Sequence, residues 1–157
     1  MGGAVGASAA LMAAAYTQRK KDVESGAAEQ AQALIRKMDV EYHLNAADLD
    51  AIAYANLQKT WKGEMDPAEK AAIEAQALAV PTDLLVTCHA QIQSIHTFLP
   101  ACNPNITSDA KVGIHLLAGA ARAAYQTVLV NAPPDDEKAR LKALLQEIRD
   151  MEDTLVE

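Results

Sequence analysis

A polar, turn-rich segment between residues 102 and 109 is the first place to look for a chemical site. It reads Cys-Asn-Pro-Asn-Ile-Thr-Ser-Asp and leads directly into an almost wholly apolar stretch from Ala110 to Asn131. Asparagine and proline favour turns, whereas a serine or aspartate oxygen can accept hydrogen bonds from the free N–H groups of a helix's first turn. We therefore expect Ser108 and Asp109 to begin a buried helix whose N-terminus carries polar side chains.

Two acids form a second candidate. Asp48 and Asp50 lie two residues apart in a stretch with helical periodicity, so they point in different directions and one of them can face inward. An isolated buried carboxylate has a raised pKa, which is the usual way to obtain a general acid at neutral pH. The alternative is that Asp48 is a surface acid or the partner of a nearby lysine.

Polar exceptions within the apolar stretch 108–131 follow one narrow stripe. Lys111, His115, Arg122 and Gln126 are separated by four, seven and four residues. The stripe is either a solvent-facing edge or a basic wall of a ligand pocket. In the second case, Arg122 could bind a carboxylate through two parallel hydrogen bonds.

The sequence offers no metal-binding pattern. His89 and His96 share a helix face but are roughly 10 Å apart at 1.5 Å per residue, which is too far to ligate one ion. The other two histidines have no ligand close in sequence, and neither a phosphate-binding loop nor a G-x-S-x-G motif is present. We expect no metal and no redox cofactor.

Helical patterns must position these residues, and the first of them is rich in small side chains. From Gly2 to about Arg19, glycine or alanine recurs every fourth residue, which leaves one face almost bare backbone. Such a face allows another helix to approach closely. It predicts either an alanine-rich core helix or a dimer contact.

Further helices follow along the chain. From Asp22 the apolar spacing stays helical until Gly63. Asp66-Pro67 is a strong start for the next helix, which Pro81 should kink or interrupt and which should stop near Pro100. Pro133-Pro134 should end the apolar helix, and Asp135 or Asp136 should cap the last one.

The predicted fold is an all-α, antiparallel bundle of about five helices joined by short loops, forming one domain over residues 1–157. The helix 108–131 should be central because it is hydrophobic nearly all round.

Composition and charge exclude several classes of partner. The net charge of -7 argues against a nucleic-acid binder, which would have a clustered basic face, and against binding to an anionic membrane surface. The apolar first fifteen residues are too short to span a bilayer and have no basic residues before them. Cys88 and Cys102 are interpreted as reduced thiols, with a single disulfide as the alternative. These features predict no membrane span and a cytoplasmic protein, with an organelle matrix as the other compartment.

Several of these segments, in this order, resemble one enzyme family. The chain is similar to the cyclodeaminase domain of formiminotransferase-cyclodeaminase and to stand-alone methenyltetrahydrofolate cyclohydrolases, from about residue 19 to 155. The matching segments are Asp22-Val23 after the basic cluster 19–21, Asp48 to Ile52, Val80-Pro81, Asn103 with Ser108-Asp109, Arg122 to Tyr125 and Val128 to Asn131.

The resemblance implies an all-α homodimer, often assembled further, that acts on a tetrahydrofolate substrate. It either closes 5-formiminotetrahydrofolate to 5,10-methenyltetrahydrofolate with release of ammonia or interconverts methenyl- and 10-formyl-folate with water. Asp48 corresponds to the family's acid and would protonate the departing ammonia. By the same resemblance, Asn103, Ser108 and Asp109 would hydrogen-bond the pterin or the one-carbon unit, and Lys20, Lys21 or Arg122 would meet the folate carboxylates.

The chain departs from the family pattern at a few positions. Gly2-Gly3-Ala4-Val5 stands where the family has a Pro-Gly-Gly-Gly-Ser loop, so the loop is either degenerate or missing. Ala46, Cys102 and Thr127 replace a family acid, glycine and asparagine, respectively. The alternative is therefore a non-catalytic cyclodeaminase-like subunit of a larger complex, and a third reading is a helical module that binds another small anion through the Arg122 stripe.

Overall fold

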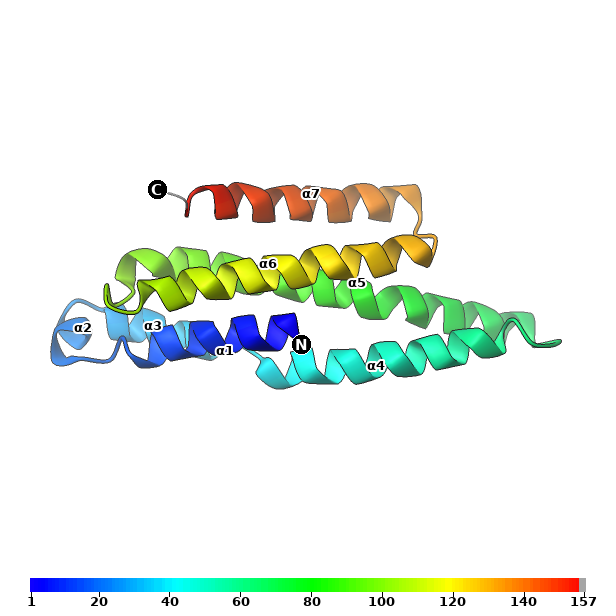
Figure 1. The fold of residues 1–157 in the computed structure, drawn as a ribbon, viewed down its shortest axis with the longest axis horizontal. Helices are drawn as coiled ribbons and strands as arrows, with labels where there is room; N and C mark the ends of the chain where they lie inside the picture. Colours follow the sequence, from blue (N-terminus) through cyan, green and yellow to red (C-terminus); the bar gives the residue numbers. More distant parts are fainter. Residues whose placement is uncertain (156–157) are drawn as a thin grey trace.

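Helices make up nearly all of the structure. The computed structural model describes residues 1–155, which contain α-helices and one short 3-10 turn but no strand (Figure 1). In chain order the elements are α1 (Gly2–Ala15), α2 (Lys20–Glu24), α3 (Ala27–Ile35), α4 (Val40–Lys59), α5 (Pro67–Phe98), η1 (Leu99–Ala101), α6 (Thr107–Val130) and α7 (Asp135–Asp153). The all-α prediction is confirmed.

The prediction of one helical stretch from Asp22 to Gly63 is wrong, because two breaks divide it into α2, α3 and α4. At the first break Gly26 has φ +79, a left-handed conformation that glycine adopts without strain. At the second, Asp39 is extended and its carboxylate accepts a hydrogen bond of 2.8 Å from the amide of Tyr42. That bond is a helix N-cap, so α4 starts afresh there.

Helix α6 is the centre of the bundle, as the sequence predicts. It packs most extensively against α1 and α5 and also against α7, and Figure 1 shows it running between α1 and α7. Ile114, Leu117 and Val128 of α6 are fully buried in the resulting core. Burial on several sides explains why this helix lacks a broad polar face.

The small-residue face of α1 packs against α6 inside the chain. A Cβ atom added to Gly6 would lie 2.9 Å from the carbonyl oxygen of Gly113, and one added to Gly113 would lie 2.9 Å from the carbonyl oxygen of Gly6. Ala10 and Ala14 on the same helix are fully buried. The core-helix interpretation of this face is therefore confirmed, and the face is not free for a dimer contact.

Helix α5 continues through Pro81 without a break, so the predicted interruption does not occur. Proline has no N–H, which leaves the carbonyl of Ala77, four residues earlier, without its helical donor. The side-chain amide of Asn131, just beyond α6, donates to that oxygen at 2.9 Å. Asn131 thus replaces the missing backbone hydrogen bond and ties the end of α6 to α5.

We expect Asn131→Ala to destabilise the protein by about 1–3 kcal/mol, because the buried Ala77 carbonyl loses its donor. In a Pro81→Ala background the restored backbone N–H can take that place, so the same change should have a much smaller effect. Urea unfolding of the four proteins measures the coupling. Equal effects of Asn131→Ala in both backgrounds would contradict this account.

Helix boundaries elsewhere follow the sequence signals closely. The Asp66 carboxylate caps α5 by accepting from the amide of Glu69 at 3.2 Å. Helix α7 follows Pro134, with Asp135 and Asp136 in its first turn rather than at the predicted cap. Its apolar stripe faces the core: Leu141, Ile148 and Leu155 are buried, and Leu144, Leu145 and Met151 are partly buried.

Among the described helices, α5 is the one that is long and apolar enough to cross a membrane by length and composition. A core helix of a bundle passes the same test, and α5 packs against α4, α6 and α7. Much of its apolar stretch is nevertheless left unburied by this chain.

Candidate functional site

A cavity of about 230 Å³ lies where the first turn of α1 meets α4, α5 and α6. We call it the α1–α4 cavity; Figure 1 shows the N-terminal end of α1 beside the beginning of α4. Its lining comes from four helices: Gly2 and Gly3 of α1, His43, Ala46, Ala47 and Asp50 of α4, Val80, Pro81 and Leu84 of α5, and Ala120, Ala123, Ala124 and Thr127 of α6, together with Met1. The cavity thus joins segments that are far apart in the sequence.

His43 is the buried titratable group of this cavity. Its side chain belongs to a residue that is 3% exposed, and its Nε2 lies 2.7 Å from Oε1 of Gln91 on α5. A carbonyl oxygen can only accept, so Nε2 carries the hydrogen and Nδ1 of the neutral ring is an acceptor. Nδ1 is buried and has no hydrogen-bond partner. The ring is therefore fixed on one side and unsatisfied on the other.

The first turn of α1 closes over this ring. A Cβ atom on Gly3 would lie 2.5 Å from Nδ1 of His43, so only glycine fits between α1 and the imidazole. No side chain caps α1, and its first amide groups have no partner within the helix. These amides and the helix dipole give this wall of the cavity a partial positive character.

Asp50, and not Asp48, reaches the cavity. His43 and Asp50 are seven residues apart, or about two helical turns, and so share a face of α4. Asp48 is 200° from Asp50 at about 100° per residue, is exposed, and is not part of the lining. The role predicted for Asp48 stays a prediction. Asp50 is also exposed, so neither acid is the buried carboxylate that the sequence offers, but Asp50 lies at the open edge of the cavity.

The loop at 102–109 lies at the other end of α1. The amide of Asn103 donates to Oγ1 of Thr17 at 3.0 Å, and its side-chain amide donates to the carbonyl of Tyr16 at 3.1 Å. Its Oδ1 accepts from the amide of Asn105 at 3.1 Å. Asn103 is 7% exposed, so these bonds leave it little capacity for a ligand. The 14 residues of α1 separate this loop from the α1–α4 cavity by roughly 20 Å at 1.5 Å per residue.

The expected caps at the start of α6 are also absent. The helix begins at Thr107 after Ile106, without a side-chain cap. Ser108 instead donates to Asp109 at 3.4 Å, while Thr107 donates to the carbonyl of Asn103 at 3.1 Å. The polar side chains of the loop thus bond to one another and to the end of α1, and their predicted contact with a folate stays a prediction.

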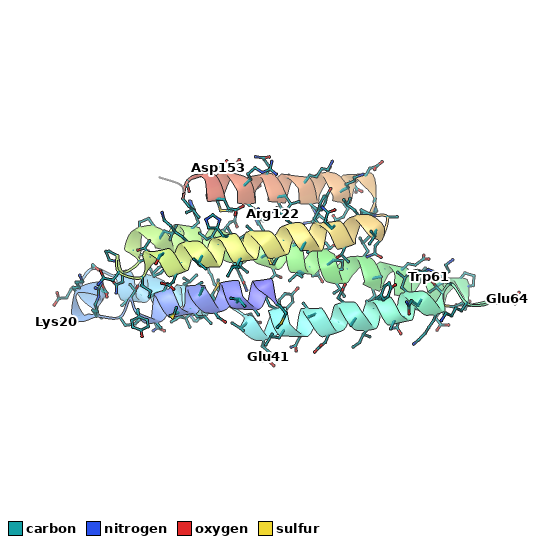
Figure 2. All side chains as sticks on the ribbon, viewed as in Figure 1. Lys20, Glu41, Trp61, Glu64, Arg122 and Asp153 are labelled. Atoms are coloured by element: carbon teal, nitrogen blue, oxygen red, sulfur yellow. The ribbon has the colours of Figure 1, made fainter. Side chains whose placement is uncertain are left out.

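The predicted basic residues do not converge on one place. Lys20 is exposed on α2 at one end of the molecule (Figure 2). Lys21 lines a separate open hollow beside residues 100–104. Arg122 lies between α6 and α7 in the same view and pairs with Glu152. None of the three lines the α1–α4 cavity.

The Arg122 stripe is a solvent-facing edge, as one of the two interpretations predicts, and three of its side chains also fasten α7 to α6. His115 and Arg122 both contact the Glu152 carboxylate, and Lys111 donates to the carbonyl of Leu155 at 2.9 Å. Burial raises the pKa of Glu152, but the hydrogen bonds from Arg122 and His115 outweigh it and hold that pKa below its ordinary value. Within this chain the charge of Arg122 is therefore paired with Glu152.

Cys88 and Cys102 are free, buried thiols. Burial raises the pKa of Cys88 to about 12 and also raises the pKa of Cys102. Neither thiol is therefore a nucleophile at neutral pH. Within residues 1–155, no three His, Cys, Asp or Glu side chains gather as metal ligands.

Comparisons with known proteins agree with this architecture. The family model described as formiminotransferase-cyclodeaminase matches residues 1–150. The crystal structure of formiminotetrahydrofolate cyclodeaminase from Thermotoga maritima superimposes with a TM-score of 0.70 over 98% of this chain and 78% of that chain, at 20% identity. This likeness establishes a shared fold, whereas no curated protein matches the sequence. On the family match over nearly its whole length, the chain belongs to the formiminotransferase-cyclodeaminase family.

Proposed function

We propose that this domain acts on a reduced folate and holds the one-carbon end of that substrate in the α1–α4 cavity. The reaction is either closure of 5-formiminotetrahydrofolate to 5,10-methenyltetrahydrofolate with loss of ammonia, or the corresponding hydration of the methenyl group. The observation that supports the proposal is the lining itself. It brings Gly2-Gly3, Asp50, Val80-Pro81 and the second half of α6 together around one buried histidine.

The chemistry suits the groups in the cavity. A protonated formimino group and the methenyl product both carry positive charge next to the pterin. The Asp50 carboxylate, on the same face of α4 as His43, can pair with that charge. The apolar side chains of Leu84, Val80 and Pro81 offer a surface for a flat ring.

The cavity is smaller than the roughly 300–1,000 Å³ typical of pockets for drug-sized ligands. It would therefore hold only the pterin and the one-carbon unit, with the rest of the folate extending outside. No lysine or arginine lines it among the described residues. A clamp for the folate carboxylates would then come from a second copy of the chain.

An exposed apolar surface on and just after α4 supports such a homodimer. Its members are Leu44, Leu49, Ile52, Tyr54 and Trp61, each more than 40% exposed. Large apolar side chains gathered on one exposed element are typical of an interface. We propose that this α4 surface packs against its counterpart in a second copy.

Ile52→Asp should convert the dimer to a monomer, because it places a charge among the exposed apolar side chains of the α4 surface. Sedimentation equilibrium measures the mass. Val23→Asp is the matched control, since Val23 is also exposed but lies on α2, at a distance from α4. An unchanged mass for Ile52→Asp would place the interface elsewhere or show that the wild type is already monomeric.

A specific observation also favours a second function. Ala46 and Thr127, which replace an acid and an asparagine of the family pattern, both line the α1–α4 cavity. A chain that lost two polar groups at the site could serve as a non-catalytic cyclodeaminase-like subunit of a larger assembly. The two proposals differ in whether the domain binds a folate at all.

Ligand binding separates them. Saturating 5-formyltetrahydrofolate should raise the melting temperature of the wild-type protein, because a ligand that binds only the folded state stabilises it. p-Aminobenzoylglutamate, which lacks the pterin, is the matched control and should give a much smaller shift. Absence of any shift, with no binding by calorimetry, would favour the assembly subunit.

A further inference from the structure

One ring nitrogen of His43 has no hydrogen-bond partner within the described chain. The imidazole is 3% exposed, and its Nδ1 is a buried acceptor without a donor. Buried polar groups in proteins are nearly always paired, because an unpaired one loses the hydrogen bond it made to water. His43 lines the α1–α4 cavity, so a ligand in that cavity could supply the missing donor.

Three features of the structure define what that partner must be. The Gln91 carbonyl at 2.7 Å holds the hydrogen on Nε2, so Nδ1 presents a lone pair. The partner must therefore be an N–H or O–H donor. The free amides of α1 lie beside the ring but make no bond to Nδ1. Among the other lining groups, the Asp50 carboxylate can only accept when it is ionised.

We propose that His43 is a catalytic acid–base residue of this cavity and that its Nδ1 moves a proton between the two nitrogens of the reacting folate. The inference rests on the proposed function, since it assigns a role within the same reaction. Gln91 is a positioning residue that fixes the tautomer this role requires.

The proton transfers balance within the substrate and one imidazole. N10 uses its lone pair to form a bond to the carbon of the protonated formimino group, and the C=N pair moves onto the terminal nitrogen. Nδ1 accepts the proton from N10, which gives an imidazolium. The imidazolium then protonates the terminal nitrogen, whose bond to carbon breaks with release of ammonia. The electron pairs of N5 and N10 stabilise the methenyl cation, and His43 returns to its neutral form.

Access to Nδ1 requires the first turn of α1 to move. Gly3 covers the nitrogen so closely that a Cβ atom at this position would lie 2.5 Å from it. The turn has no side-chain cap, and Gly2 and Gly3 carry no side chain to anchor it. Ligand entry can therefore displace these residues without disrupting the buried Ala10–Ala14 segment that packs against α6.

Histidine labelled with ¹⁵N provides a test that does not depend on turnover. Two-bond ¹H–¹⁵N spectra of the full chain should show the Nε2–H tautomer for His43. Adding 5-formyltetrahydrofolate, which retains N10–H but has no ammonia to lose, should shift the Nδ1 resonance of His43. His96, which is hydrogen-bonded to Thr154, is the internal control and should not shift.

Variants test the catalytic role directly. His43→Gln should lower kcat by about 10²–10⁴-fold, the usual contribution of a positioned acid–base group, with little change in folate binding. Gln91→Leu should lower kcat and change its pH profile because the tautomer is no longer fixed, whereas Gln91→Glu retains an acceptor and should rescue activity. His96→Gln is the control and should match the wild type.

The outcomes distinguish the proposed folate reaction from the acid–base role of His43 within it. A wild-type protein that binds no folate overturns the proposed function and this inference with it. A protein that binds 5-formyltetrahydrofolate without moving the His43 Nδ1 resonance overturns the inference alone. Full activity in a folded His43→Gln protein does the same, while the shift and the loss of activity together support it.

Discussion

Replacing Asp50 by asparagine should lower kcat/KM for the folate reaction by about 10²–10³-fold, the typical loss when one preorganised electrostatic partner of a transition state is removed. Asp50 lines the α1–α4 cavity and can pair with the positive charge of the formimino and methenyl groups. Asparagine keeps the size of the side chain, so folding should be preserved. Measuring the rate at which methenyltetrahydrofolate forms, by its absorbance, tests this expectation.

Asp48→Asn is the matched control for that experiment. It removes the same charge two residues away, on the opposite side of α4, and should leave the rate near the wild-type value. The reverse result, with Asp48→Asn inactive and Asp50→Asn active, would restore the role predicted from the sequence. It would also place the reaction at the exposed side of α4, where a second chain would have to complete the site.

Gly113→Ala should destabilise the protein by about 1–3 kcal/mol, the usual effect of forcing extra volume into a packed contact. The added Cβ would lie 2.9 Å from the carbonyl oxygen of Gly6 and 3.4 Å from the amide nitrogen of Ala10. Because both atoms belong to the backbone of α1, the helices would have to separate. Urea unfolding with a common m-value gives the change in the free energy of unfolding.

Gly119→Ala on the same helix is the control. A Cβ atom there would meet nothing within 4 Å, so alanine should increase stability by about 0.5–1 kcal/mol through its higher helix propensity. The opposite signs of the two substitutions are the expected result. Similar effects at both positions would mean that α1 and α6 do not approach as closely as the Gly6–Gly113 contact requires.

Much of the fold could be predicted from local signals. The apolar character of residues 110–131 identifies α6 as the central helix, and Asp66-Pro67 marks the start of α5. Caps and periodicity act within a few residues of one another, which is why the sequence displays them directly. Gly26 and Asp39 are signals of the same kind, because each directly precedes a helix. The apolar spacing continues across both positions, so it predicts one helix where the structure has three.

Pro81 shows where local reasoning fails. A proline inside a helix removes one hydrogen bond, and from the sequence alone an interruption is the natural expectation. The bond is replaced by Asn131, which lies 50 residues further along the chain. Only the packing of α6 against α5 brings that amide to the Ala77 carbonyl.

Helical periodicity and ordered motifs are properties of neighbouring residues, so the all-α class, the central helix and the family resemblance can be predicted from the sequence. Which side chains share a site depends on how the helices pack. The tertiary structure separated Asp48 from the 102–109 loop, since α1 holds that loop by its far end. It brought His43, Asp50 and Gly3 to one cavity, because residues seven apart share a face of α4 and the packing of α1 decides which face meets Gly3.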